Sequence, residues 1–400
     1  MREYKKESNI IIIINALRKI IEIFSGPFLT TYFIKTSLES ILDISIYNVF
    51  SYIVLAITCL IVGYIIKNKF RMAAFRAGVI INFIYILTII ILKERIIQHL
   101  WLLAILYGLF SGLYFMPFNL ILGNKIKNED RTGYEVKKEM ISSIINIVIP
   151  IVLGSIITVT NYILTAVIIL ILSLIQIILS FVLKPLEESG EKFNMKGMIQ
   201  VVKKNKDIKR MMLAEYLTGI SVNNSALATI ATILIYNAFQ TDLNLGIITS
   251  ISYILQLIVI YLYGKRYKEK SDKNIIILLS IIPMITLGMF LLYPNAVTVI
   301  IYNLYFTIFV NLIGIIRSVR LYNISNSGEI NRSNQEEFWS IREVCLNLGR
   351  ATGFVILLVA GITANSAVLN IVMIMLTMII LVLGAVLSKV DKNKYENKKI

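Results

Sequence analysis

Long apolar runs separated by short polar breaks recur along the whole chain. There are twelve of these runs, and roughly 20 apolar residues are enough to cross a bilayer as a helix. Inside a membrane every backbone polar group needs an internal hydrogen bond, which a helix provides. The sequence therefore predicts an all-α membrane protein with 12 transmembrane helices. The predicted spans are 10–34, 44–66, 76–92, 98–122, 139–159, 162–183, 211–236, 244–264, 274–293, 297–316, 338–361 and 366–388.

The longest internal polar segment, 184–210, divides these spans six and six. It begins with a turn-rich run, and apolar residues then recur among lysines from Phe193 to Val202. That pattern is typical of a short amphipathic helix on a membrane surface, and a solvated linker is the alternative interpretation. We expect an N-terminal six-helix half over 1–183, a cytoplasmic linker, and a C-terminal six-helix half over 211–400.

The charge distribution predicts an orientation. The chain has 40 Lys and Arg against 24 Asp and Glu, a net charge of +16. Most cationic residues precede the first span or follow an even-numbered span, whereas Lys35, Lys93 and Arg95 lie in the opposite loops. Because Lys and Arg accumulate on the cytoplasmic side, we expect a cell-membrane protein with both termini in the cytoplasm. This bias and attraction to anionic lipid heads explain the charge without a nucleic-acid partner.

The sequence has no pattern that indicates an enzyme. It contains no Walker-A motif, no Ser/His/Asp set and no metal-ligand cluster, and its one histidine is His99. We therefore expect no enzymatic activity, no cofactor and no metal. A transport function would have to use an ion gradient rather than ATP.

Charges inside the first span are the first candidate site. Glu22 is near the middle of that span, where an unpaired charge costs about 2.5 kcal/mol or more. Arg18 precedes it by four residues and so shares its helix face. The two side chains are either a structural ion pair or a functional pair. In the functional interpretation Glu22 carries a proton during transport or binds a cationic group, and Arg18 adjusts its protonation.

The eleventh span contains the second concentration of charge. Glu343, Asn347 and Arg350 stand at offsets 0, 4 and 7, along one helix face. Such a row faces protein or water rather than lipid, and we take it as a candidate for substrate binding or proton coupling. A row that only locks helices together is the alternative. Arg342 is expected at the inner interface, where its long side chain reaches the aqueous surface.

Uncharged polar and aromatic residues near the middle of other spans are candidates for a cavity wall. Many such residues only join helices, because Asn and Ser often form hydrogen bonds across a membrane bundle. Aromatic residues in spans also serve as packing. The candidate cavity-lining residues are Asn223, Asn224, Asn119, Asn311, Asn146, Tyr114 and Tyr32.

One motif links the chain to a known family. The loop after the second span reads Gly63-Tyr64-Ile65-Ile66-Lys67-Asn68-Lys69-Phe70-Arg71. With its two sets of six spans, the chain resembles a major facilitator superfamily transporter. In that family an acid follows this glycine by four residues and joins a charge relay that holds the loop to the eleventh span. Here Lys67 replaces the acid, and the span-four arginine of the family is also absent.

The resemblance implies two six-helix halves with the substrate near the membrane midplane, and secondary active transport by alternating access. The midspan acid favours proton coupling, and the apolar, Tyr-rich spans favour export of a small amphipathic or drug-like compound. The expected partners are this small molecule, protons and the lipid bilayer, and the protein is expected to be a monomer. The alternatives are an uptake permease for a sugar or an organic anion bound by Arg350, a lipid or glycolipid flippase, and a membrane sensor.

Overall fold

The computed structural model describes residues 2–37, 40–68, 70–125, 128–184, 192–222, 224–266, 272–325, 330 and 334–390. Helices account for almost all of these residues, and none of them is in a strand. The helices are α1 (Arg2–Ile23), η1 (Phe24–Phe28), α2 (Leu29–Thr36), α3 (Ser40–Asn68), α4 (Arg71–Leu92), η2 (Lys93–His99), α5 (Leu100–Lys125), α6 (Asn128–Val159), α7 (Tyr162–Val182), α8 (Met195–Lys204), α9 (Lys206–Ser221), α10 (Ala226–Phe239), α11 (Asp242–Arg266), α12 (Asp272–Leu292), α13 (Ala296–Ser325), α14 (Gln335–Thr363) and α15 (Ser366–Leu387).

The predicted spans correspond to these helices, and the all-α fold class is confirmed. The first span comprises α1, η1 and α2, the seventh comprises α9 and α10, and each of the others is a single long helix. Among the described residues, ten helical stretches are long and apolar enough to cross a membrane by length and composition. One of them, Arg71–Phe118, contains α4, η2 and most of α5.

The first span changes its helix type two residues after Glu22. Residues Phe24–Phe28 form a π-helix that contains Gly26 and Pro27. Proline has no N–H and its ring collides with the carbonyl four residues earlier, so a regular α-helix cannot continue unchanged. Single π-helical turns of this kind occur frequently at functional sites.

The seventh span is interrupted between α9 and α10. Asn224 has a φ of 48°, a left-handed conformation that asparagine tolerates better than most residues. Ser225 then begins α10, with its side chain accepting a hydrogen bond from the Ala228 N–H. Asn and Ser are preferred at such helix starts because their oxygens satisfy free backbone N–H groups.

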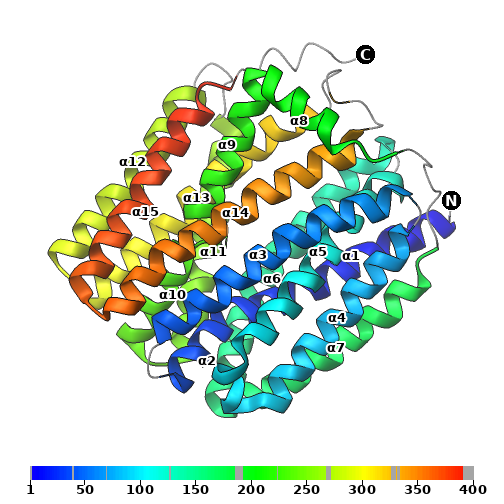
Figure 1. The fold of residues 1–400 in the computed structure, drawn as a ribbon. Helices are drawn as coiled ribbons and strands as arrows, with labels where there is room; N and C mark the ends of the chain where they lie inside the picture. Colours follow the sequence, from blue (N-terminus) through cyan, green and yellow to red (C-terminus); the bar gives the residue numbers. More distant parts are fainter. Residues whose placement is uncertain are drawn as a thin grey trace.

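The helices pack within two groups, α1–α7 and α9–α15, which meet mainly where α3 runs along α14 and α6 runs along α11. Figure 1 shows these two groups side by side, with the start of α1, the end of α15 and α8 at the same end of the bundle. We call this the termini end and the opposite one the far end. Within the segment between the groups, the predicted amphipathic helix is present as α8, which buries Met198 and exposes Lys203 and Lys204.

Candidate functional site

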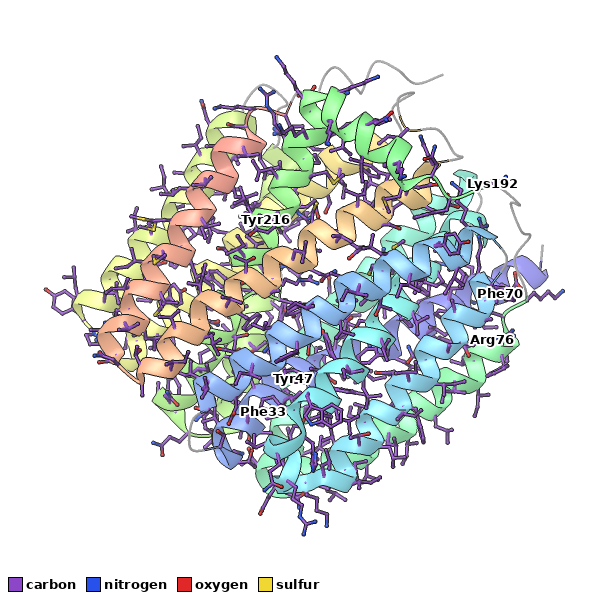
Figure 2. The ribbon with its side chains drawn as sticks, viewed as in Figure 1. Phe33, Tyr47, Phe70, Arg76, Lys192 and Tyr216 are labelled. Carbon is purple, nitrogen blue, oxygen red and sulfur yellow. The ribbon has the colours of Figure 1, made fainter. Side chains whose placement is uncertain are left out.

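A cavity of about 220 Å³ lies between the two helix groups. Its lining positions fall in the middle of the helices or toward their far ends, so it extends from the centre of the bundle toward the far end. Phe33 and Tyr47, which Figure 2 labels next to each other, belong to its wall and have ring centroids 5.4 Å apart. The lining residues are Arg18, Lys19, Glu22, Ile23, Ser25, Gly26, Pro27, Leu29, Thr30, Phe33, Tyr47, Asn48, Tyr52, Tyr107, Phe110, Pro150, Asn224, Ala228, Thr229, Thr232, Thr249 and Tyr253.

The charged part of this wall comes from α1. Arg18 donates from Nε to Oε1 of Glu22 across 3.1 Å, and Nζ of Lys19 lies 4.0 Å from Oε2 of the same carboxylate. Glu22 retains 30% side-chain exposure, whereas Arg18 retains 4%. Glu22 is the one acidic side chain among the described lining residues.

Three aromatic rings lie against the guanidinium of Arg18. Its guanidinium carbon lies 4.7 Å from the ring centroid of Phe110, 5.2 Å from that of Tyr114 and 5.0 Å from that of Phe115. A cation over aromatic faces is attracted by their negative electrostatic potential. The predicted cavity residue Tyr114 therefore contacts the guanidinium of Arg18 and is not itself among the lining residues.

The charged row of α14 continues into a longer network within the second group. Arg350 donates from Nη1 to Oδ1 of Asn347 across 2.8 Å, and Asn347 donates to the backbone carbonyl of Glu343, also across 2.8 Å. Arg342 donates to Glu343 and also, across 2.7 Å, to Glu215 of α9. These residues do not belong to the described cavity wall.

The sequence analysis did not assign Glu215 and Arg317 to this network, and it placed Arg342 outside it. Glu215 of α9 is fully buried and receives a second charged hydrogen bond from Arg317 of α13. Arg342 was expected to extend to the membrane surface, but the carboxylates of Glu215 and Glu343 hold it inside with 14% side-chain exposure. Buried charges need such partners, because an unpaired buried charge is strongly destabilising.

The remaining predicted cavity residues lie in several environments. Asn224 lines the cavity, whereas Asn223 and the side chain of Asn119 lie outside the described residues. Asn311 joins α13 to α11 by donating to Gln256, 2.9 Å away. Tyr32 stacks on Tyr162 with centroids 4.2 Å apart, and neither Tyr32 nor Asn146 is among the described lining residues.

Several lining residues escaped the sequence analysis although they follow a helical period. Thr229 and Thr232 of α10 share a face with Ser225, and Thr249 and Tyr253 of α11 are four residues apart. Polar residues repeating every three to four positions in an apolar helix indicate a face turned to protein or water.

Ion pairs close the interface at the termini end. Lys67 of α3 pairs with Glu337 of α14, and both side chains are at most 2% exposed. Nη2 of Arg71 lies 3.1 Å from Oε1 of Glu336. Glu337 also accepts a hydrogen bond from the backbone N–H of Asn194, just before α8. The chain therefore keeps a charged contact between the loop after span two and span eleven, with the base on the loop and the acid on the span.

A smaller contact closes the far end. Asp242, at the start of α11, accepts a hydrogen bond from Thr31 of α2 across 2.6 Å and pairs with Lys35. Asp242 is buried, whereas Lys35 is 41% exposed and lies 5.6 Å from the ring centroid of Tyr236. Charged contacts between the two helix groups therefore lie on both sides of the cavity, toward the termini end and toward the far end.

The fold, the cavity between two helix groups and the contacts at its two ends define a multi-pass membrane transporter. The sequence profile of the Major Facilitator Superfamily matches residues 11–354, and the chain belongs to this family. The expectation drawn from the loop motif and the spans is confirmed.

The individual proteins that resemble this chain share little sequence identity with it. A Bacillus subtilis (strain 168) protein described as uncharacterized protein YqgE is 24% identical over 361 residues, covering 87% of this chain and 83% of that protein. The crystal structure of a mutant of the nucleoside transporter NupG has a TM-score of 0.66 at 15% identity, over 96% of this chain and 100% of that one. A bacterial homologue of the iron transporter ferroportin, in an inward-facing state, also has a TM-score of 0.66, at 13% identity over 97% and 99% of the two chains. At these identities the two solved structures show a shared fold.

Proposed function

We propose that the protein is a proton-coupled secondary transporter that works by alternating access, with Glu22 as the proton carrier. The observation that carries the proposal is the position of Glu22 as the one acid of the described cavity wall, next to the π-helical turn of the first span. Both its partners, Arg18 and Lys19, come from its own helix, so the carboxylate has no ion-pair partner in the second group among the described residues. Protonation of Glu22 therefore changes the charge of the cavity directly.

Export of a small amphipathic compound is the direction that we favour. The cavity combines aromatic rings from Phe33, Tyr47, Tyr52 and Tyr107 with threonine hydroxyls on the opposite wall. Flat apolar compounds with one or two hydrogen-bonding groups fit such a lining, because most ligand sites pair apolar surface with few polar groups.

Lys19 favours a second candidate, uptake of an organic anion together with protons. The cavity wall carries two cations and one acid, so its fixed charge is positive and becomes more positive when Glu22 is protonated. An anion and a proton would then support each other's binding, because opposite charges attract strongly away from water. Proton-driven exchange instead requires the proton and the substrate to compete for Glu22.

Transport into proteoliposomes tests the role of Glu22. A thermal-shift screen of the purified protein against sugars, organic ions, antibiotics and lipids first selects a stabilising compound. We expect Glu22→Gln to abolish accumulation driven by a proton gradient while preserving exchange between loaded compartments, since exchange moves no net proton. Glu94→Gln, an exposed acid in η2, is the matched control and should accumulate normally. A Glu22→Gln protein that still concentrates the compound would refute the role of Glu22 as proton carrier. Whether accumulation needs protons to flow in the same direction as the compound or in the opposite direction separates uptake from export.

We also propose that the termini end faces the cytoplasm of a cell membrane, as the distribution of Lys and Arg favours. The test uses cells that produce the protein with Cys59 and Cys345 replaced and one new cysteine introduced. An impermeant thiol reagent added outside these cells should then label a cysteine at Asn295. It should not label one at Lys204. Outside labelling at Lys204 would reverse the orientation.

A further inference from the structure

Tyr52 of α3 lies where the cavity, the interrupted seventh span and the charged row of α14 meet. Its side chain is 4% exposed and belongs to the cavity wall. Its hydroxyl donates to the backbone carbonyl of Asn224 across 3.1 Å. The guanidinium carbon of Arg350 lies 5.3 Å from its ring centroid, and the ring of Phe354 stacks on it at 5.8 Å. One side chain of the first helix group therefore contacts two elements of the second.

The hydroxyl contact fixes the start of α10. The Asn224 carbonyl lies just before that of Ser225, which accepts a backbone hydrogen bond from the Thr229 N–H at the start of α10, and Asn224 has a left-handed backbone. By donating to the Asn224 carbonyl, Tyr52 holds the interruption against the first group. Ala228, Thr229 and Thr232, which follow on α10, form the opposite wall of the cavity. The position of that wall therefore depends on a hydrogen bond from Tyr52.

The ring contact connects Arg350 to the cavity. Arg350 is not among the described lining residues, but the ring of Tyr52 is, and a cation near an aromatic face is attracted to it. On its other side Arg350 donates to Asn347, which continues the network through Glu343 toward the termini end. A molecule in the cavity that shifts the Tyr52 ring would therefore also displace the guanidinium of Arg350, which is the first member of this network.

We infer that Tyr52 is a positioning residue that joins the cavity wall to the charged row of α14, and that Arg350 acts on the cavity through it rather than by touching substrate. This inference rests on the proposed alternation between two open states. It assigns Arg350 an indirect role. Movement of the α10 wall and the hydrogen bonding of Arg350 with Asn347 then change together.

The reactivity of a cysteine on α10 tests this inference without substrate. Cys59 and Cys345 are replaced by alanine, Thr229→Cys is introduced, and the rate of modification by N-ethylmaleimide is measured on the purified full chain. Tyr52→Phe removes only the hydroxyl, and we expect it to raise the rate about fivefold, the factor that corresponds to losing one ordinary hydrogen bond. Phe354→Leu removes a ring stacked on Tyr52 but leaves the hydroxyl donor, so its increase should be clearly smaller. Equal increases in variants of equal thermal stability would reduce Tyr52 to a packing residue and overturn the inference.

A double-mutant cycle tests the connection to Arg350. Tyr52→Leu and Arg350→Met are compared with the protein that carries both changes. If Arg350 acts through Tyr52, the double variant should react at the rate of Tyr52→Leu alone, because coupled residues give non-additive effects. Additive effects would show that Arg350 acts independently and would overturn the inference. If Tyr52→Leu lowers thermal stability sharply, the same cycle is run with Tyr52→Phe, and additivity has the same meaning there. The reaction requires no proton gradient, so failure of the Glu22 proposal leaves this test unchanged.

Discussion

The termini end and the far end of the interface between the helix groups are both closed, but by charge pairs that differ in burial. At the termini end Lys67 and Glu337 are almost completely buried, and the Asn194 N–H adds a hydrogen bond to the same carboxylate. At the far end a buried Asp242 faces Lys35, which is 41% exposed. Water screens an exposed cation, so this pair contributes little, whereas a buried charge that loses its partner is strongly destabilising.

The backbones also approach each other differently at the two ends. At the termini end Gly63 of α3 faces the side chain of Ser340, 2.1 Å from where a β-carbon would lie. At the far end Gly246 of α11 faces the backbone carbonyl of Pro150 in α6, 2.2 Å from the equivalent position. The termini end therefore depends more on charge and the far end more on close backbone contact. We expect the far end to open at the smaller electrostatic cost.

Glu337→Ala should have the largest effect on this comparison. It removes the buried carboxylate that pairs with Lys67 across the interface, which destabilises the contact by about 3–5 kcal/mol. A cysteine at Ser340, next to Gly63 on the α3–α14 contact, should then react rapidly with N-ethylmaleimide, and the melting temperature should fall.

Replacing both members of the pair separates charge from packing. Lys67→Met with Glu337→Leu removes both charges of the pair and fills similar volume, so most of the lost stability should return. If Glu337→Ala alone reacts and melts like the unchanged protein, the buried pair does not hold this end closed.

Gly246→Ala should have the next largest effect, and it acts on the far end. The new methyl group meets a backbone carbonyl of α6 that cannot rotate away, so α11 must shift, at a cost of about 1–3 kcal/mol. Gly63→Ala is the matched control, because the Ser340 side chain can change its rotamer to make room. Melting temperatures of the two variants provide the test. A larger loss in Gly63→Ala would reverse the assignment of close backbone contact to the far end.

Local sequence patterns predicted the spans and the α1 ion pair. Apolar runs of sufficient length specify membrane helices, and the four-residue spacing of Arg18 and Glu22 brings them together in any α-helix. The interruption of the seventh span also had a local signal, the run of Asn and Ser from Asn223 to Ser225. In each case the partners are close in sequence, so helix geometry alone decides their contact.

Contacts between distant spans could not be predicted in this way. Lys67 and Glu337 are 270 residues apart, and the family pattern indicated an acid where Lys67 stands, so the reversed polarity became visible only with both helices in place. Tyr52 looked like any aromatic residue of an apolar span. Its role depends on how α3 is rotated against the interruption at Asn224 and against Arg350, which one helix's periodicity does not determine.

Asp242→Asn should have the smallest effect, and it tests the weak pair of the far end directly. Asparagine keeps an acceptor for the Thr31 hydroxyl but loses the charge that faces Lys35. Because Lys35 is partly exposed, the loss should be at most about 1 kcal/mol and should shrink further in concentrated salt. Opening is measured as the rate at which an impermeant thiol reagent, added from the far side, labels a cysteine at Thr232 in the cavity wall. Lys35→Met should give a larger increase than Asp242→Asn, because it leaves the buried Asp242 carboxylate bonded to Thr31 but without its cation. An increase in Asp242→Asn as large as that of Glu337→Ala at the termini end would mean that burial does not distinguish the two pairs, and that both ends are held with comparable strength.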